Sequence, residues 1–272
     1  MIYLCWNCRW LGSDATVGEL RWLVSMYLPS FLFLLETKMK DTCARNFMYY
    51  LEYTGSFEVS CDGLSGGIAL FWLPQFDVSL KGFNAHCIDV VISSECSTPW
   101  STFFIYGEPC REKRHEFWSL LTRLRDQWNG PWLACGDFNE VLCQDEYAGP
   151  RERLESQVGQ FKDYLDACGL TDMGFSGPMF TWTNKQEGDD LVRVRLDRAV
   201  ANGAFLDTYD DSMVENIIAT TSDQYAILIR ISKGGAQVDR RPVQTGFRFE
   251  AAWLRAPDRL QRYSGEVLAG GF

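Results

Sequence analysis

An aspartate and an asparagine two residues apart, Asp137 and Asn139, follow an apolar run (132–135) and a glycine. If the run is a buried strand, Gly136 lets the backbone turn closely at its end. The two polar side chains then point the same way, since strand side chains repeat with a period of two, and Phe138 points into the core. A carboxylate beside a carboxamide can hold a water or a metal-bound phosphate, although the same residues also fit a plain turn.

Polar residues follow other apolar segments of the chain in the same way. They are Asn7, Glu36, Tyr106, Asp197 and Asp223. Strand ends converge on one edge of a layered α/β fold, so these side chains are expected to gather there. Carboxylate and amide oxygens suit a hard cation such as Mg²⁺, whereas two histidines without metal-binding spacing do not favour a Zn²⁺ site.

The segments that position these residues mix strand-like and helix-like patterns. Helices are expected at 16–26, with Ser13 or Asp14 as its cap, at 111–128 and at 157–168. Strands are expected at 2–8, 31–35, 67–72, 76–83, 87–93, 100–106, 132–135, 170–173, 180–183, 192–200 and 226–231. Helices join some strand pairs and hairpins join others, which favours two mixed sheets with helices outside.

Composition predicts one large globular domain or two small ones. The 272 residues are 46% hydrophobic and 14% aromatic, which is enough for a sizeable core. We place the domain at 1–231, because Gly234-Gly235 then opens a polar stretch. Residues 232–272 carry seven Lys or Arg and four Asp or Glu, so this segment is expected to be a basic linker or tail.

Net charge and cysteine content indicate which partners and which cellular compartment to expect. The net charge of −10 means that contact with a polyanion must be local or assisted by a metal. Ten cysteines form no disulfide framework, and the CxxC pair Cys5 and Cys8 would face opposite sides of a strand. No apolar run approaches the ~20 residues of a membrane span, and no secretory leader is visible. We expect an intracellular protein, nuclear or cytoplasmic, that is not secreted and does not engage a membrane.

Seven short motifs occur in an order that resembles the endonuclease/exonuclease/phosphatase superfamily. They are Trp6-Asn7, Glu36-Thr37-Lys38, Tyr106-Gly107, Gly136-Asp137-Phe138-Asn139, Thr181-Trp182, Arg195-Leu196-Asp197 and Ser222-Asp223. Cys5-Trp6-Asn7-Cys8-Arg9, Gly66-Gly67-Ile68-Ala69-Leu70 and the segment 247–254 resemble most closely the endonuclease domain of plant non-LTR retrotransposons. The resemblance implies a DNase-like four-layer α/β sandwich, metal-dependent phosphodiester hydrolysis and a chain truncated before any reverse transcriptase. Tyr209-Asp210-Asp211 lacks the apolar strands of a polymerase motif and is expected to be a loop.

The resemblance also implies roles for five residues. Glu36 would be the main Mg²⁺ ligand, with Asn7 beside it. Asp137 would orient or deprotonate the attacking water, and Asn139 and Tyr106 would hold the phosphate. The metal would neutralise charge that develops on the phosphate oxygens.

The chain departs from the family at its last motif. There the family has Ser-Asp-His, with Asp197 as the partner of the histidine, and this chain has Gln224 after Asp223. Glutamine can donate a hydrogen bond but cannot titrate or carry positive charge. Losing a positioned acid, base or charged donor costs roughly 10²–10⁴ in rate, so hydrolysis is expected to be strongly reduced or absent. His86 and His115 lie far from this edge in sequence and are not expected to stand in.

DNA is the expected partner, held weakly by a local basic patch. Its candidate contacts are Arg151, Arg153, Arg193, Arg195 and Arg198, which could equally form an ordinary solvated charged face. No obligate protein partner is inferred. One alternative is a catalytically inactive domain that only binds nucleic acid or protein. Another is the same fold acting on a lipid headgroup, but the membrane-docking segments of such enzymes are not visible.

Overall fold

The computed structural model describes residues 1–39, 43–61, 66–95, 97–150 and 155–234. Residues 1–236 form one compact unit. The predicted tail lies outside the described residues except for 232–234, so its extent stays a prediction. No helix in the described part of the chain has both the length and the apolar character needed to cross a membrane.

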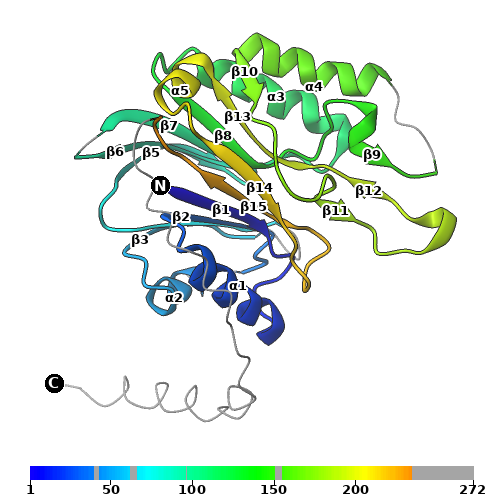
Figure 1. Cartoon of the computed structure of the whole chain (residues 1–272), viewed down its shortest axis with the longest axis horizontal. Coiled ribbons are helices and arrows are strands. Elements are labelled where there is room, and N and C mark those ends of the chain that lie inside the picture. The colour runs from blue at the N-terminus through cyan, green and yellow to red at the C-terminus, as the bar shows by residue number, and fades with distance from the viewer. Residues whose placement is uncertain (40–42, 62–65, 96, 151–154, 235–272) are drawn as a thin grey trace. The chain divides into compact units, whose positions relative to one another are not determined.

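Two six-stranded mixed sheets form the centre of the domain (Figure 1). The first has the strand order β14 (Met213–Ile217), β15 (Ala226–Arg230), β1 (Ile2–Asn7), β2 (Phe31–Leu35), β4 (Ile68–Trp72) and β3 (Gly55–Val59). The second has the order β10 (Leu170–Asp172), β13 (Asp197–Asn202), β8 (Trp132–Asp137), β7 (Ser97–Tyr106), β6 (Cys87–Ser94) and β5 (Asp77–Asn84). A small third sheet contains β11 (Trp182–Thr183), β12 (Arg193–Val194) and β9 (Tyr147–Ala148). Each large sheet has one parallel pair, β1–β2 and β7–β8, and its other pairs are antiparallel.

Helices cover the outer faces of the two large sheets (Figure 1). On the first sheet, α1 (Asp14–Tyr27) and α2 (Cys43–Tyr50) enclose an apolar cluster with Leu4, Leu32 and Leu228. On the second, α3 (Arg114–Arg125) and α4 (Glu155–Cys168) pack on Phe103 and Ala134. The helix α5 (Gly203–Thr208) follows β13. These four layers confirm the predicted DNase-like α/β sandwich.

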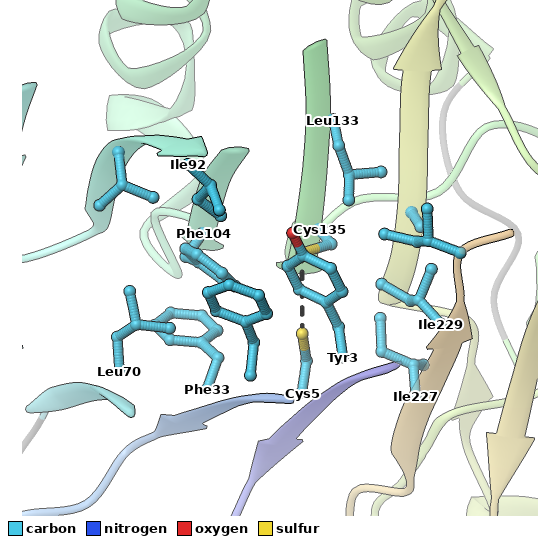
Figure 2. Close-up of a cluster of buried hydrophobic side chains, with 14 of the residues drawn as sticks. Tyr3, Cys5, Phe33, Leu70, Ile92, Phe104, Leu133, Cys135, Ile227 and Ile229 are labelled. Carbon is cyan, nitrogen blue, oxygen red and sulfur yellow. Dashed lines mark hydrogen bonds between the residues drawn. The ribbon is translucent and has the colours of Figure 1, made fainter. Parts of the chain in front are cut away.

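The main core lies between the two sheets (Figure 2). Tyr3 stacks on Phe31 with ring centroids 4.6 Å apart, and the thiols of Cys5 and Cys135 meet across the sheets with 3.7 Å between their Sγ atoms. Cys8 instead belongs to the cluster under α1, so the two cysteines of the CxxC motif face opposite layers as expected. Both are free thiols.

Several predicted elements have different bounds in the structure. The helix expected at 16–26 begins at Asp14, because Ser13 Oγ accepts the Thr16 N–H at 3.0 Å and caps it. The helix expected at 111–128 begins at Arg114 after a 3₁₀ turn and ends at Arg125. The prediction of one continuous strand at 192–200 was wrong, because the chain passes there from β12 in the small sheet to β13 in the second large sheet.

Elements without a clear apolar period were not predicted. The edge strand β3 is half-buried at every position and therefore shows no alternation, and α5 is too short for a helical stripe. The helix α2 and the strand β14 were also missed. Tyr209-Asp210-Asp211 forms the turn between α5 and β14, which confirms that it is a loop.

Candidate active site

Parallel strand pairs bring the first polar residues together. Asn7 ends β1 opposite Leu35 of β2, and Glu36 follows β2 directly. Buried Asn7 donates from Nδ2 to Glu36 Oε1 at 2.9 Å and reaches Asp137 Oδ2 of the other sheet at 3.3 Å. Its Oδ1 accepts the Arg9 N–H at 3.2 Å. Asn7 therefore orients Glu36 and links the two sheets at this edge.

The second sheet supplies three further residues at the same edge. Its strand register places Tyr106 and Asp197 on either side of Asp137. The Asn139 N–H donates to Asp137 Oδ1 at 2.9 Å, and Asn139 Nδ2 donates to the carbonyl of Gly107 at 2.7 Å. Asn139 thus lies beside the end of β7, which carries Tyr106, and their role in holding a phosphate stays a prediction.

Gly136 acts differently from the sequence-based expectation. The strand does not turn at Gly136 but continues through Asp137. Gly136 has a φ of 132°, and a Cβ there would overlap the carbonyl oxygen of Ile105 on the neighbouring strand. Glycine is therefore needed for the close approach of β8 to β7, which sets the position of Asp137.

Gln224 completes the hydrogen-bonded row. Its Nε2 donates to Asp137 Oδ2 at 3.1 Å, so the residue in the place of the family histidine contacts the predicted water-orienting carboxylate. Ser222 fixes the loop, because its Oγ donates to the Asn7 carbonyl at 2.8 Å and accepts the Gln224 N–H at 3.1 Å. Gln224 Oε1 is buried without a hydrogen-bond partner.

Asp223 has different partners from Gln224. Arg9 binds its carboxylate with two hydrogen bonds, from Nε at 2.7 Å and from Nη2 at 2.6 Å. Trp182 Nε1 donates to the same carboxylate at 3.0 Å. Sequence reasoning gave Arg9 no role, although its position two residues after Asn7 was visible.

Burial and like charge disfavour ionisation of Asp137 and Asp197. Burial raises the pKa of Asp137, and the nearby Glu36 carboxylate raises it further. Burial and then Asp137 raise the pKa of Asp197 well above its usual range. Asp197 Oδ2 has no hydrogen-bond partner, while the Asp197 N–H donates to Thr181 Oγ1 at 3.0 Å. Burial, Glu36 and Asp137 also raise the pKa of Tyr106. A cation at this edge would relieve these effects.

Three residues at this edge have a left-handed backbone conformation, which also occurs elsewhere in the chain, for example at Leu28 and Lys185. Arg9, Glu36 and Asn139 have φ values of 60°, 49° and 54°, in the left-handed region that side chains with a Cβ seldom adopt. Asparagine tolerates this region, whereas arginine and glutamate are strained by about 1 kcal/mol or more each. Strain of this kind gathers at functional sites, where the surrounding structure holds it in place.

The donor set fits a hard cation that keeps most of its water. Among the described residues no three His, Cys, Asp or Glu side chains are grouped as a metal cage. Mg²⁺ commonly uses one or two carboxylates and takes its other ligands from water and phosphate. Glu36 is the partly buried carboxylate at this edge, and Asn7 orients it. The role of Glu36 as a metal ligand stays a prediction. Direct ligation by Asn7 stays a prediction.

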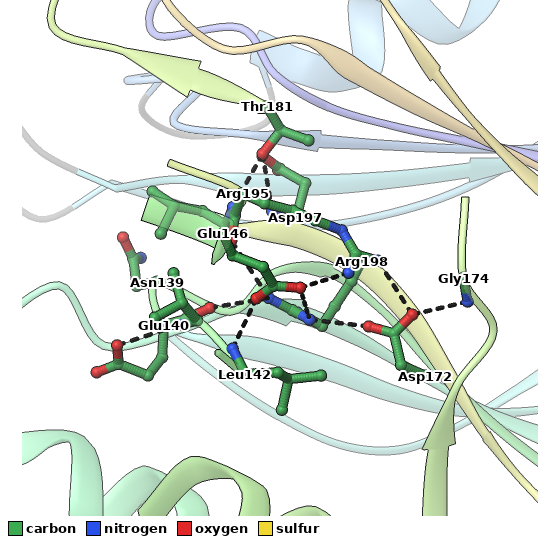
Figure 3. Close-up of polar contacts among 12 residues, drawn as sticks. Asn139, Glu140, Leu142, Glu146, Asp172, Gly174, Thr181, Arg195, Asp197 and Arg198 are labelled. Carbon is green, nitrogen blue, oxygen red and sulfur yellow. Dashed lines mark hydrogen bonds and ion pairs between the residues drawn. The ribbon is translucent and has the colours of Figure 1, made fainter. Parts of the chain in front are cut away.

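Two predicted DNA contacts were wrong. Arg195 and Arg198 are buried in an ion cluster with Glu146 and Asp172 (Figure 3). Arg198 Nη2 lies 2.8 Å from Glu146 Oε2, its Nη1 lies 2.8 Å from Asp172 Oδ2, and Arg195 Nη1 lies 2.6 Å from Glu146 Oε1. Neither guanidinium is available to a DNA backbone. Because Arg198 also donates to the Glu140 carbonyl, this buried ion cluster ties the loop after β8 to β13.

The other basic candidates have different outcomes. Arg193 is exposed, with its guanidinium 5.0 Å from the centre of the Phe180 ring. Arg151 and Arg153 lie outside the described residues. His86 was not expected near the site because it lies far from the site residues in sequence. In the structure its ring packs on Tyr106, with ring centroids 6.1 Å apart. Its Nε2 lies 3.1 Å from Glu108, so His86 adjoins the site but is already paired.

Solved structures share this fold. The 3′ phosphatase NExo from Neisseria bound to a product DNA hairpin is 17% identical, with a TM-score of 0.62 and coverage of 86% of this chain and 100% of that one. The endonuclease domain of TRAS1, a telomere-specific non-LTR retrotransposon, is 14% identical, with a TM-score of 0.65 and coverage of 86% of this chain and 99% of that one. An AP endonuclease from Archaeoglobus fulgidus is 13% identical, with a TM-score of 0.67 and coverage of 86% of this chain and 100% of that one. At these identities the likeness establishes the fold alone.

Sequence comparison establishes the family. The chain belongs to the Endonuclease/Exonuclease/phosphatase family, which matches residues 4–223. A search of curated protein sequences finds no significant match. The family match confirms the resemblance drawn from the seven motifs.

Proposed function

We propose that the chain is a Mg²⁺-dependent phosphodiester hydrolase of the retrotransposon endonuclease type, which nicks DNA at a rate reduced by Gln224. The supporting observation is the row of hydrogen bonds from Glu36 through Asn7 and Asp137 to Gln224, which joins both sheets at one edge. These groups carry the chemistry that phosphodiester hydrolysis requires, except for a titratable residue at position 224.

Each residue has a role in this proposal. Glu36, oriented by Asn7, would hold Mg²⁺, and the ion when bound neutralises charge on the phosphate oxygens. Asp137 accepts hydrogen bonds and would orient the attacking water. Tyr106 and Asn139 would hold the phosphate from the end of β7 and the loop after β8. Asp197 and Asp223 would support the site without the imidazolium that the family pattern supplies.

The wider assignment also stays a proposal. Arg193 is the described candidate for contact with DNA, and Arg151 and Arg153 lie on the segment that follows β9. The net charge of −10 opposes general DNA binding, so affinity is expected to be weak and local. We assign the chain to a plant non-LTR element acting inside the cell, in the nucleus or cytoplasm, with no obligate protein partner.

A second candidate function is a catalytically inactive domain that binds nucleic acid or protein. Gln224 favours it, because its amide occupies the hydrogen-bonding position beside Asp137 without offering a proton to a leaving group. This candidate keeps the fold and the charged edge but predicts no turnover.

Nicking of supercoiled plasmid in Mg²⁺ separates the two candidates. The native chain is compared with Gln224→His, Glu36→Ala and the control Glu116→Ala, which removes an exposed carboxylate on α3. Gln224→His should raise the rate roughly 10²–10⁴-fold, Glu36→Ala should abolish it and the control should not change it. Turnover at the level of active family members with no gain from Gln224→His contradicts the proposed impairment. If even Gln224→His does not nick, the inactive binding domain is the better description.

A further inference from the structure

Arg9 places a positive charge at the candidate active site. Its guanidinium forms two hydrogen bonds to Asp223, and its Nη1 lies 3.8 Å from Glu36 Oε2. Burial works to lower the pKa of Arg9, but the Glu36 and Asp223 carboxylates outweigh it and raise the pKa. The side chain therefore bridges the predicted metal ligand and the loop that carries Gln224.

One edge of the guanidinium remains free to bind a ligand. Asp223 takes Nε and Nη2, and no acceptor in the described part of the chain lies within hydrogen-bonding distance of Nη1. The Arg9 side chain is 42% exposed, so an incoming anion can reach it. Trp182 donates to the same Asp223 carboxylate and helps to hold it in place. The result is a fixed arginine whose open N–H groups lie beside Glu36.

The Arg9 guanidinium is a positive charge in a site that otherwise contains mostly carboxyl groups. Glu36, Asp137, Asp197 and Asp223 are all carboxyls, and Gln224 brings no charge. Among the described residues that contact Glu36 or Asp223, Arg9 is the one that is positively charged. Arginine matches the geometry of phosphate oxygens and stays protonated at any working pH.

We propose that Arg9 is a catalytic residue that binds the phosphate of the scissile bond and supplies the positive charge that Gln224 cannot. Nη1 donates to a phosphate oxygen while Asp223 keeps the guanidinium in place. This inference rests on the proposed phosphodiesterase function. It assigns the residual activity of the chain to Arg9, whose left-handed backbone conformation is then strain held at a functional site.

Nicking rates of four chains test the proposal: native, Arg9→Gln, Gln224→His and the double variant. If Arg9 and a cation at position 224 stabilise the same developing charge, Arg9→Gln should lower kcat roughly 10²–10³-fold in the native background and less than about tenfold beside Gln224→His. Arg9→Lys, which keeps the charge, should recover part of the loss. Equal losses in both backgrounds, or faster nicking by Arg9→Gln, overturn the proposal.

Binding of a short DNA duplex in EDTA, where no hydrolysis occurs, gives a readout apart from activity. Arg9→Gln should reduce the slope of log K against log salt by about one, and Arg9→Lys should restore it. The matched control is Arg125→Gln on α3, since Arg125 is also 42% exposed and also paired with an aspartate. Thermal unfolding of every variant checks that the domain still folds.

The two assays distinguish failure of this inference from failure of the proposed function. If no chain nicks but Arg9→Gln still reduces the salt slope, the hydrolase proposal fails and the phosphate-binding role of Arg9 stands without catalysis. If the slope does not change, or the native chain does not bind the duplex, Arg9 only clamps Asp223 and the inference is overturned.

Discussion

Replacing Glu146 with glutamine tests what the buried ion cluster contributes to stability. Glu146 is 4% exposed and accepts hydrogen bonds from Arg195 Nη1 at 2.6 Å, Arg198 Nη2 at 2.8 Å and the Leu142 N–H at 2.6 Å. Glutamine keeps the shape but removes the charge, which leaves fully buried Arg198 with Asp172 as its remaining carboxylate. Breaking a buried pair in this way costs about 3–5 kcal/mol.

Urea unfolding followed by tryptophan fluorescence measures this cost. With an m-value near the upper end of the usual ~1–3 kcal/mol per M, the midpoint of Glu146→Gln should fall by about 1–2 M. The control is Glu215→Gln, because Glu215 and Arg230 form a pair at 4.0 Å on the surface, where loss of charge costs at most about 0.5–1 kcal/mol. If the midpoint of Glu146→Gln falls no further than that of the control, the cluster does not hold the domain together.

The same cluster predicts a pH dependence. Burial acts to raise the pKa of Glu146, but Arg198 and Arg195 outweigh it, so the pKa of Glu146 is lowered in the folded chain. A lowered pKa means that the charged carboxylate stabilises the fold above its unfolded pKa of ~4.3, and that this contribution is lost as pH falls through the folded value. The difference between the native chain and Glu146→Gln should therefore shrink below about pH 4. A difference that stays constant down to the acid transition contradicts an ionic origin.

Two further substitutions test other features of the fold. Gly136→Ala should lower the yield of folded protein or reduce the free energy of unfolding by roughly 3 kcal/mol or more, because the new Cβ would overlap the Ile105 carbonyl oxygen. The control Gly82→Ala should be tolerated, because there is open space around Gly82. Asp89→Asn should stabilise the domain by about 1–3 kcal/mol at pH 7, because burial raises the pKa of Asp89 to about 6. The folded carboxyl then holds its proton between about pH 4 and 6, and the native chain loses stability as pH rises through that window. An unchanged pH profile in Asp89→Asn contradicts this.

Local patterns in the sequence determined most elements and the residue types of the candidate site. Alternating or continuous apolar runs located β1, β2, β7 and β8, and Ser13 is one of the two residues that were predicted to cap α1. For Asn7, Glu36, Tyr106 and Asp137, the polar residue at the end of each run indicated the candidate site, because the parallel pairs β1–β2 and β7–β8 end at the same edge. Asp197 instead begins β13, which runs antiparallel to β8. Elements that lack a period, such as β3 and α5, could not be found in this way.

Tertiary structure alone decided which charged groups meet. Arg193, Arg195 and Arg198 look alike in the sequence. The passage of the chain from β12 to β13 leaves Arg193 exposed but places Arg195 and Arg198 against the carboxylates of Glu146 and Asp172. Gln224 contacts Asp137 and Arg9 binds Asp223 across 87 and 214 positions of the chain. The sequence by itself indicated where many strands end and which polar residues stand there, because strand ends follow from short-range apolar periodicity. Their partners, burial and pKa values depend on the order of strands in the sheets, which arises only when the whole core packs.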